Sequence, residues 1–397
     1  MSKIMAVNAG SSSLKYQLLD MPSANVLCSG VIERIGLEDS IFNIEINGEK
    51  HKDILDIENH EKAVNLVLEA LTKYNVVKSL DEIDGVGHRC VHGGEKFASS
   101  VVLDDEVSKT MEELSDLAPL HNPANLIGYH AFKKALANVG HVAVFDTAFH
   151  QTMEADTFVY PIPYEFYKEY GVRKYGFHGT SHLYVSERCI DLLGNPSSSK
   201  IITCHLGNGA SLAAIKNGKS INTSMGLTPL AGVMMGTRSG DIDPAIITFL
   251  MDKTGKTAYE ITDILNKESG MLGVSGISSD ARDIEDGYNA GDERAKLTVE
   301  IYINRIVDTI GSYFVKLGGL DAIVFTAGLG ENSISFREMI CEKLTDALGV
   351  KLDKERNNVR GKETLISADD SKVKVYLIPT NEELVIAQDT MKLLNLK

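Results

Sequence analysis

The first twenty residues combine two patterns of apolar and polar positions. Residues 4–8 open with four consecutive apolar side chains, whereas residues 14–18 alternate apolar with polar side chains. A short continuous apolar run is typical of a buried strand, and alternation is typical of a strand with one solvated face. The segment between them is rich in glycine and serine. These patterns predict a strand, a turn and a second strand.

A similar segment occurs in the second half of the chain. Residues 3–14 (KIMAVNAGSSSL) and 200–212 (KIITCHLGNGASL) share an apolar run, a polar residue at its end, a glycine-containing turn and a Ser-Leu pair. The second copy continues through Asn217-Gly218, a dipeptide typical of tight β-hairpins. The similarity predicts an internal duplication, with chance likeness between two strand-turn-strand segments as the alternative.

The rest of the chain alternates helical with strand periodicity. Apolar residues fall on one face of predicted helices at 61–74 and 293–317, and the second of these is expected to stop at Gly318-Gly319. Residues 321–344 indicate a buried strand, a glycine turn and a helix, an arrangement whose crevice binds ligands in open α/β sheets. Residues 373–396 add a strand and a terminal helix. The predicted fold class is therefore α/β.

Length and composition bound the architecture and the compartment. A chain of 397 residues exceeds what one hydrophobic core usually supports, so two domains are expected. The five cysteines are odd in number and include no C-x-x-C pair, which argues against a disulfide framework and a zinc ribbon. No stretch of about 18 apolar residues could span a bilayer. We therefore expect a cytoplasmic protein with no membrane partner.

The charge balance limits the partners. Forty basic residues against 55 acidic ones give a net charge of -15, so a nucleic-acid partner is not expected. An anionic substrate would then need a local pocket of opposite sign. This requirement directs attention to clustered arginine and histidine residues.

Three segments of small residues follow predicted strands. They are residues 8–13, 205–209 and 328–332. Glycines let backbone N–H groups approach phosphate oxygens, and clustered amides and hydroxyls form anion-binding nests. No G-x-x-x-x-G-K-[ST] phosphate loop is present, and residues 328–333 match only half of a dinucleotide fingerprint. The three segments together favour a nucleotide whose phosphates lie between two domains.

Two arginines lie where a guanidinium would meet an anion. Arg89 lies among apolar neighbours at the end of a β-like run, and a buried guanidinium needs an anionic partner. Arg238 lies in a glycine-rich loop before a helix, for which Asp243 is the expected N-cap and Pro244 the first-turn residue. The two guanidinium groups could together neutralise a carboxylate and a transferring phosphoryl group.

Histidines and one aspartate complete the candidate chemistry. His88 and His92, like His178 and His182, have the spacing of metal ligands on a helix, but neither pair encloses the glutamate of a zinc-protease motif. Zinc is therefore the weaker hypothesis. His121 and His178 lie in loops, where functional residues are common. Asp146 ends a predicted buried strand, where a carboxylate is costly without a partner.

Nine motifs, in order along the whole chain, resemble the acetate kinase family of carboxylate kinases. They are NAGSSSLK, HRCVHGG, LHNP, VFDTAFH, YGFHGTSH, HLGNGAS, GTRSGDIDP, FTAGLGEN and PTNEE. The resemblance implies a two-domain duplicated fold of the actin-like/sugar-kinase (ribonuclease H-like) type with its active site in the interdomain cleft. It also implies a homodimer that transfers the γ-phosphoryl group of ATP to acetate, forming acetyl phosphate and ADP. The expected domains are residues 1–148 with 384–397, and residues 149–383, the latter binding nucleotide and forming the dimer.

The resemblance assigns residues to roles. The groups implied in catalysis are Asp146, Arg89, His178 and Arg238. The implied ATP-binding residues are Lys15, His205, Leu206, Gly207, Asn208, Gly209, Asp280, Ala281, Arg282, Gly328, Leu329, Gly330, Glu331 and Asn332. The implied acetate pocket comprises Arg89, Val91, Leu120, Phe177 and Pro229, and Asn8 and Glu382 would support Mg²⁺, or Mn²⁺ as the alternative ion.

The resemblance implies that Asp146 is the catalytic acid or base, and elementary chemistry questions this role. Acetate is ionised at neutral pH because carboxyl pKa values lie near 4, so its oxygen can attack phosphorus with no proton removed. We therefore expect Asp146 to orient Arg89 or a metal-bound water rather than to act as a base. Propionate or butyrate kinase is the alternative within this class, because one methylene changes binding by only about 1–3 kcal/mol. A nucleotide-gated binding protein of the actin type and a zinc hydrolase are the alternatives from other classes.

Overall fold

The structure is a computed structural model that describes residues 1–119 and 121–397. The chain forms two compact units, one of residues Met1–Ala148 with Asn381–Lys397 and one of residues Phe149–Thr380. The second crossing of the chain was predicted at residue 384 and lies instead at 381. The reason is helix capping: the Asn381 side chain accepts a hydrogen bond from the Leu384 amide at 3.1 Å, so the cap and first turn belong with the terminal helix.

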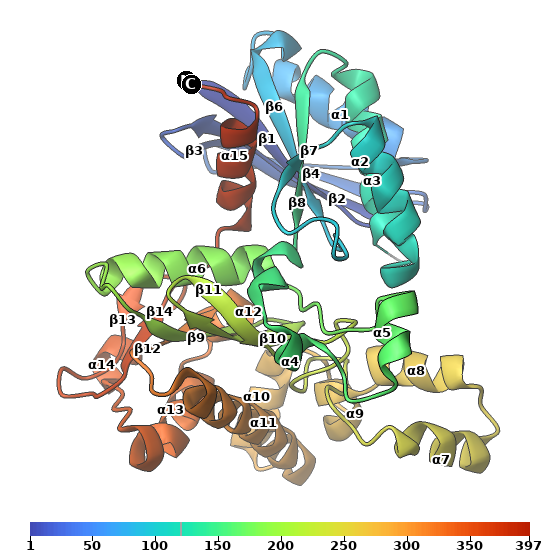
Figure 1. The fold of residues 1–397 in the computed structure, drawn as a ribbon. Helices are drawn as coiled ribbons and strands as arrows, with labels where there is room; N and C mark the ends of the chain where they lie inside the picture. The colour runs from blue at the N-terminus through green and yellow to red at the C-terminus, as the bar shows by residue number, and fades with distance from the viewer. Residues whose placement is uncertain (120) are drawn as a thin grey trace. The chain divides into compact units, whose positions relative to one another are not determined.

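Unit 1 is built on an eight-stranded sheet (Figure 1). Its strands, in the order β5-β4-β3-β2-β1-β6-β8-β7, are β5 (Glu49–Leu55), β4 (Ser40–Ile46), β3 (Asn25–Glu33), β2 (Ser13–Met21), β1 (Ser2–Ala9), β6 (Ile83–Cys90), β8 (Gly140–Phe145) and β7 (Val101–Val102). Strands β1, β6 and β8 are parallel neighbours, and the other pairs are antiparallel. The first two strands confirm the predicted strand-turn-strand opening.

Helices cover both faces of this sheet. On one face Met5 and Val7 join a core with α1 (His60–Lys73) and α3 (Asn122–Ala135). On the other, Ile4 and Ala6 pack with α15 (Glu382–Leu393). Successive side chains of a strand point to opposite faces, so one continuous apolar run serves both cores. A further helix, α2 (Asp105–Glu113), packs on α3.

Unit 2 contains a six-stranded sheet with helices on both faces (Figure 1). Its strands, in the order β11-β10-β9-β12-β14-β13, are β11 (Lys219–Thr223), β10 (Ala210–Lys216), β9 (Lys200–Leu206), β12 (Ala322–Thr326), β14 (Lys374–Leu377) and β13 (Thr364–Leu365). Helix α6 (Gly179–Leu192) packs Val185 and Cys189 on one face, and α11 (Glu293–Leu317) lies on the other. The remaining helices are α4 (Ala155–Phe158), α5 (Tyr164–Tyr170), α7 (Ala245–Thr254), α8 (Ala258–Lys267), α9 (Gly270–Ser275), α10 (Ala281–Ala290), α12 (Ala327–Asn332), α13 (Ile334–Leu348) and α14 (Lys354–Asn357).

Both sheets share one order of strand directions. The run β3-β2-β1-β6-β8 is antiparallel, antiparallel, parallel and parallel, and so is the run β11-β10-β9-β12-β14. This shared order accords with the predicted duplication. The hairpin at Asn217-Gly218 is confirmed, because both residues have positive φ (52° and 75°). Helix α11 ends, as predicted, at Gly318 in a left-handed conformation.

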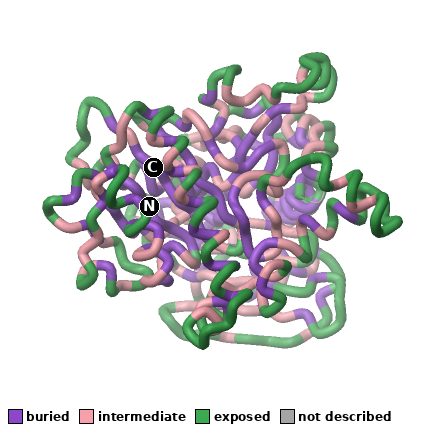
Figure 2. The backbone as a smooth tube through the Cα atoms, turned by 90° about the horizontal axis from the view of Figure 1, so that it is seen from below, coloured by how far each residue is buried: buried purple, intermediate pink, exposed green. Residues whose placement is uncertain are grey.

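Burial follows the sheets. The strands β1, β8, β9 and β12 consist almost entirely of buried residues, and Figure 2 shows exposed segments mainly in loops at the periphery. Among the described residues, none of the helices has the length and apolar character needed to cross a membrane.

Two buried histidines lie on adjacent strands of unit 1. Nε2 of His88 on β6 lies 3.0 Å from Nδ1 of His141 on β8, and the Tyr129 ring lies nearly perpendicular to both imidazoles. Burial lowers the pKa of both imidazoles. The pKa of His141 falls to about 4, and the positive charge of the nearby Lys133 contributes to this decrease. Both rings are therefore neutral in the folded protein at neutral pH.

This pair should make unit 1 sensitive to acid. The unfolded chain takes up a proton on His141 below pH 6.5 and the folded chain only near pH 4, so folding stability falls as pH falls through this window. We expect His141→Gln to reduce this slope by up to about 1.4 kcal/mol per pH unit. Urea unfolding between pH 4.5 and 8 measures it, with His51→Gln as the control. Equal slopes for wild type and His141→Gln would contradict the assignment.

Candidate active site

Three polar side chains meet at one edge of the unit 1 sheet. Asn8 and Arg89 lie near the ends of β1 and β6, and Asp146 directly follows β8. The carboxyl ends of parallel strands share an edge, which is why residues so distant in sequence converge. Arg89 donates from Nε to Asp146 Oδ1 at 3.0 Å, from Nη2 to Asp146 Oδ2, and from Nη1 to Asn8 Oδ1 at 3.2 Å.

The Arg89–Asp146 pair is bidentate and largely buried. The Asp146 side chain is 3% exposed and that of Arg89 is 23% exposed. Burial alone would lower the pKa of the guanidinium, but the Asp146 and Glu382 carboxylates raise it above its ordinary value. The predicted anionic partner of Arg89 is thus Asp146, and one edge of the fixed guanidinium faces Asn8. A planar cation held in this way can present its remaining donors to a carboxylate.

Two more predicted residues complete this cluster. A small cavity is lined by Asn8, Lys15, Arg89 and Glu382, and Lys15 lies opposite Asn8 in the β1–β2 pairing. Glu382 is the first residue of α15. Burial raises the pKa of its carboxyl to about 7. The Arg89 charge lowers this pKa, and the Asp146 charge raises it.

A second cluster of predicted residues lies in unit 2. The His178 and His205 rings stack with centroids 4.1 Å apart. Gly209 lies against both His178 and Arg238, since a Cβ there would meet Arg238 Nη1 at 3.3 Å and the His178 ring at 3.5 Å. Arg238 donates from Nη1 to the Pro229 carbonyl at 3.3 Å, and burial lowers the pKa of its guanidinium. The structure therefore brings His178, His205, Gly209 and Arg238 together.

Hydroxyl groups hold the histidines in place. Ser211 Oγ lies 2.9 Å from His178 Nδ1 and 2.7 Å from His182 Nε2, and Ser181 Oγ lies 2.8 Å from His205 Nδ1. His178 is the N-cap of α6 with a left-handed backbone (φ 55°), so its ring projects from a strained turn.

The metal-ligand spacing considered for the histidines is not that of a helix in either pair. His88 is on strand β6 and His92 follows its end, while His178 precedes α6 as its cap. In the second pair, a serine hydroxyl bridges the rings.

The start of α7 differs from the expected N-cap at Asp243. Pro244 occupies the cap position, and Asp243 Oδ1 accepts a hydrogen bond from the Ala245 amide at 2.9 Å. The proline has no N–H to leave unsatisfied there.

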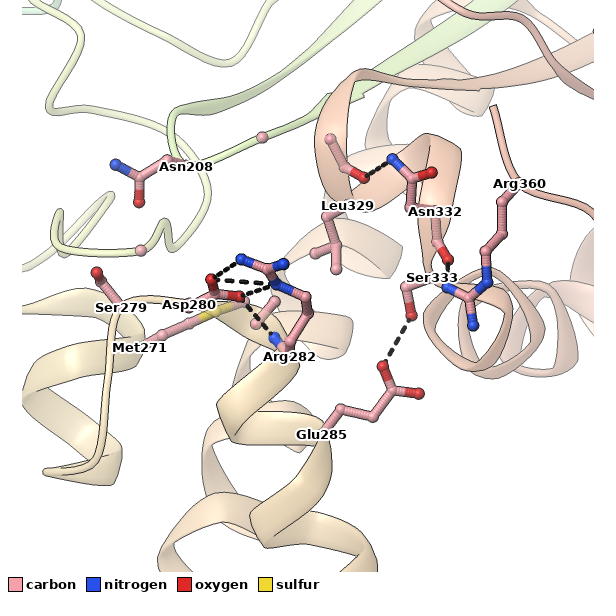
Figure 3. Close-up of a pocket in the computed structure, with 14 residues that line it drawn as sticks. Asn208, Met271, Ser279, Asp280, Arg282, Glu285, Leu329, Asn332, Ser333 and Arg360 are labelled. Atoms are coloured by element: carbon pink, nitrogen blue, oxygen red, sulfur yellow. Dashed lines mark hydrogen bonds and ion pairs between the residues drawn. The ribbon is translucent and has the colours of Figure 1, made fainter. Parts of the chain in front are cut away.

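A cavity in unit 2 has a volume of about 490 Å³ (Figure 3). Three segments predicted to bind ATP contribute to its wall, through Gly207, Asn208, Asp280, Ala281, Arg282, Gly328, Leu329 and Asn332. The Asp280 carboxylate caps α10 and binds the Arg282 guanidinium, which lowers the pKa of that carboxyl to about 2. The size suits a nucleoside rather than a metal ion or acetate.

Six predicted ATP-binding residues do not line this cavity. His205 and Gly209 belong to the histidine cluster, and Leu206 is a fully buried core residue. Glu331 Oε1 accepts hydrogen bonds from the Ala327 amide at 2.8 Å and the Thr380 amide at 3.1 Å, so it fastens two loops. The Gly330 carbonyl accepts a hydrogen bond from the buried Arg337 at 2.9 Å. Lys15 lies in unit 1.

The segment predicted as a glycine turn after β12 is a short helix. Ala327 begins it with φ 63°, and residues 327–332 form α12. The Glu331 carboxylate satisfies the Ala327 amide and so closes the turn. The predicted acetate-pocket residues Val91, Phe177 and Pro229 are buried or half-buried, each within its own unit. Leu120 lies outside the described residues.

The sequence reasoning missed several residues of the cavity wall. They are Gly236, Met271, Ser279, Glu285, Ser333 and Arg360. Helical spacing would have found Glu285, because it lies one turn after Arg282 on α10. Arg360 comes from a loop with no periodic pattern, so no sequence signal marked it.

Comparison with known proteins now decides the family. The acetokinase family model matches residues 3–388. An acetate kinase of Bacillus mycoides is 60% identical over 394 residues, which are 99% of both chains. This chain belongs to the acetokinase family.

Solved structures of acetokinase relatives have the same fold. The acetate kinase of Porphyromonas gingivalis superimposes with a TM-score of 0.95 at 50% identity, covering 99% of this chain and 100% of that one. A propionate kinase of Francisella tularensis gives a TM-score of 0.93 at 40% identity, again covering 99% of this chain and 100% of that one. The chain therefore has the predicted two-unit α/β fold of the actin-like/sugar-kinase type, and it is a kinase.

A fully buried arginine supports the cavity wall of this acetokinase. Arg337 on α13 donates to the Gly330 carbonyl at 2.9 Å, the Asn357 side chain at 2.8 Å, the Asn357 carbonyl at 2.9 Å and the Val359 carbonyl at 2.8 Å. These acceptors are neutral, and burial lowers the pKa of the guanidinium to about 10. The side chain joins α12 to the loop that carries Arg360.

Replacing Arg337 should destabilise unit 2 and loosen the cavity. Arg337→Met leaves four buried acceptors without their donor, so we expect a loss of about 3 kcal/mol or more in unfolding free energy. ADP affinity should fall as well, because α12 and the Arg360 loop lose their link. Calorimetric melting and ADP titration measure the two effects, with exposed Arg305→Met as the control. A variant as stable as this control would contradict the prediction.

Proposed function

We propose that this protein is an acetate kinase that transfers the γ-phosphoryl group of ATP to acetate, reversibly and by direct in-line attack. The observation that carries the proposal is the nucleoside-sized cavity of unit 2, lined by all three segments predicted to bind ATP, in a chain 60% identical to an acetate kinase. The propionate kinase alternative is not favoured, since the relative of that name is 40% identical.

Arg89 is the proposed binding group for the acetate carboxylate. Acetate is already an anion at neutral pH, so its attack on phosphorus requires no general base. Both Asp146 oxygens are engaged by the Arg89 guanidinium. We therefore assign Asp146 a positioning role, in which it fixes the plane and charge of Arg89. The methyl group of acetate would contact the apolar residues Val91, Leu120, Phe177 and Pro229.

His178 and Arg238 are the proposed groups that stabilise the transferring phosphoryl. The transition state spreads negative charge over the equatorial oxygens, and fixed donors stabilise it without reorganisation. Arg238 is held beside Gly209, and Ser211 orients His178, so both donors are fixed in advance. The absence of a side chain at Gly209 leaves room for phosphate oxygens against both groups.

Asn8 and Glu382 are the proposed protein ligands of a divalent metal. Their amide and carboxylate oxygens are the donor type that Mg²⁺ and Mn²⁺ prefer. The raised pKa of Glu382 fits this role, because a bound cation would favour the ionised form that burial disfavours. When bound, the ion would neutralise charge on the nucleotide phosphates. Lys15, across from Asn8, would add a further positive charge.

Acyl-phosphate trapping with hydroxylamine tests the activity. Full-length protein with ATP and Mg²⁺ should form hydroxamate with acetate, with lower kcat/KM for propionate and butyrate. Product that appears only with the longer acids would favour the alternative kinases. ATP hydrolysis that is slow and insensitive to acetate would instead indicate a binding protein of the actin type.

Asp146→Asn separates positioning from proton transfer. The amide cannot accept both guanidinium donors, so Arg89 should shift and kcat should fall by about tenfold to hundredfold. The pH profile of kcat should keep its shape, because no ionisation of Asp146 is used. Rates from pH 5.5 to 9 measure this, with exposed Asp81→Asn as the matched control. Loss of an ionisation limb that wild type possesses would assign Asp146 as a base.

A homodimer is the proposed assembly, with α7 at its interface. This helix has six apolar residues among ten, yet none of its residues is buried, and Phe249 is 59% exposed. Helix α8 packs beside it and exposes 89% of Tyr259. A helix with this composition is normally covered.

The reducing cytoplasm is the proposed compartment. All five cysteines are free thiols, which is typical of a protein in a reducing compartment.

Phe249→Asp should weaken the dimer. A charge placed in an apolar contact costs desolvation, so the sedimentation of the variant should shift toward monomer at micromolar concentration. Ile54→Asp provides the control, since Ile54 is equally exposed but lies on the unit 1 edge strand. A Phe249→Asp protein that sediments like this control would remove α7 from the interface.

A further inference from the structure

The parallel pairing of β1 with β6 stops just before the residues of the candidate active site. The last pair in the register of these two strands is Val7 with His88. Asn8 and Arg89, the proposed metal ligand and the proposed acetate-binding group, are the next residues of the two strands. Neighbouring strands hold each other through backbone hydrogen bonds, so their separation past the last pair depends on other contacts.

Asn125 on α3 supplies such a contact with its side-chain amide. Its Nδ2 donates to the carbonyl of Ala9, the last residue of β1, at 2.8 Å. Its Oδ1 accepts from the amide of Val91, which follows β6, at 3.0 Å. The side chain is buried, and an amide offers a donor and an acceptor side by side. One side chain therefore satisfies a backbone group of each segment and joins the two.

A glycine one turn further along α3 fixes how closely the helix approaches β1. Gly128 lies on the same face of the helix as Asn125, three residues later. A Cβ at position 128 would lie 2.5 Å from the Cβ of Ala9, much closer than two carbon atoms can approach. The missing side chain therefore lets α3 lie against the end of β1, within reach of the short Asn125 side chain.

The first turn of α3 extends this support past β6. Asn122 Oδ1 accepts a hydrogen bond from the His92 amide at 3.2 Å, and its Nδ2 donates to the His92 carbonyl at 3.0 Å. The Arg89 guanidinium is anchored separately, through its ion pair with Asp146 after β8. Helix α3 thus fixes the backbone on both sides of the gap that the guanidinium spans toward Asn8.

We propose that Asn125 is a positioning residue that keeps the strand ends carrying Asn8 and Arg89 at a fixed distance. By holding the Val91 backbone, it also sets the length of the acid pocket. The proposal rests on the proposed function, which gives these residues their roles. Arg89 Nη1 reaches Asn8 Oδ1 at 3.2 Å, so separating the strand ends would break this contact. A Val91 that cannot shift disfavours an acid with one more methylene.

Two substitutions test this role by different physical means. Asn125→Leu keeps the approximate volume but removes the donor and the acceptor, whereas Gly128→Ala pushes α3 away from β1 and leaves Asn125 intact. In acyl-phosphate trapping, each should lower kcat/KM for acetate by about tenfold to hundredfold, mainly through a higher KM, because Arg89 is displaced. The preference for acetate over propionate should narrow by about threefold or more.

Two further measurements separate positioning from general damage. The Mg²⁺ concentration that gives half of the maximal rate should rise in both variants, because Asn8 shifts with the end of β1. Binding of ADP without metal or acid should remain at the wild-type value, since the cavity predicted to bind the nucleotide lies in unit 2. A merely structural role of Asn125 would lower the melting temperature and leave the acid preference unchanged.

The chain offers a matched control for each substitution. Gly311→Ala adds the same methyl group to α11, where a Cβ would have no atom within 4 Å among the described residues, and should leave every quantity unchanged. Asn357→Leu removes a buried asparagine of unit 2 that binds Arg337. It should lower stability and ADP affinity without changing the acid preference.

The outcomes separate this assignment from the proposed function. A folded Asn125→Leu protein with the wild-type acetate KM and acid preference overturns the role of Asn125. If Asn125→Leu melts below the assay temperature, Gly128→Ala decides by the same criterion. A wild type that forms no acyl phosphate with any of the acids contradicts the proposed function instead.

Discussion

The carboxyl edge of three parallel strands is the constraint on which the site depends. In unit 1 the strands β1, β6 and β8 end together, so Asn8, Arg89 and Asp146 meet although 138 residues separate the first from the last. Parallel neighbours require long crossover connections, which here contain α1 and α3. The connections can therefore vary while the strand ends remain together. The same order of strand directions recurs in unit 2, where His205 lies next to the last residue of β9 and α12 follows β12.

Charge at this edge is arranged so that each buried group constrains another. Asp146 is tolerated in the interior because a bidentate guanidinium satisfies both of its oxygens, and Arg89 is tolerated for the same reason. Among the residues that the structure describes, Glu382 has no such direct partner, and burial raises its carboxyl pKa to about 7. The cluster thus holds one satisfied pair beside one carboxylate that gains from an added cation. An anion bound to Arg89 and a cation bound to Glu382 would stabilise each other.

The sequence predicted much of the fold because its local patterns were unambiguous. The apolar run of β1, the hairpin dipeptide Asn217-Gly218 and the glycine stop after α11 each have one favoured conformation. The sequence required an anionic partner for the buried Arg89 and led us to expect Asp146 to orient either Arg89 or a metal-bound water; the contact in the structure is with Arg89. Glu285, Ser333 and Arg360 were missed because a cavity wall gathers residues from unrelated segments. Only the tertiary packing of α10 and α13 places them together.

The walls of the unit 2 cavity are held by polar contacts from residues that do not line it. Arg337 is buried behind the wall and joins the Gly330 carbonyl to the loop before Arg360. Glu331 links the start of α12 to Thr380, in the segment that follows β14. Because each of these contacts satisfies a buried backbone group, losing one would expose an unpaired donor or acceptor and move the wall. Gly330 and Glu331 therefore hold α12 in place without lining the cavity. Gly328, Leu329 and Asn332 of the same helix form part of its wall.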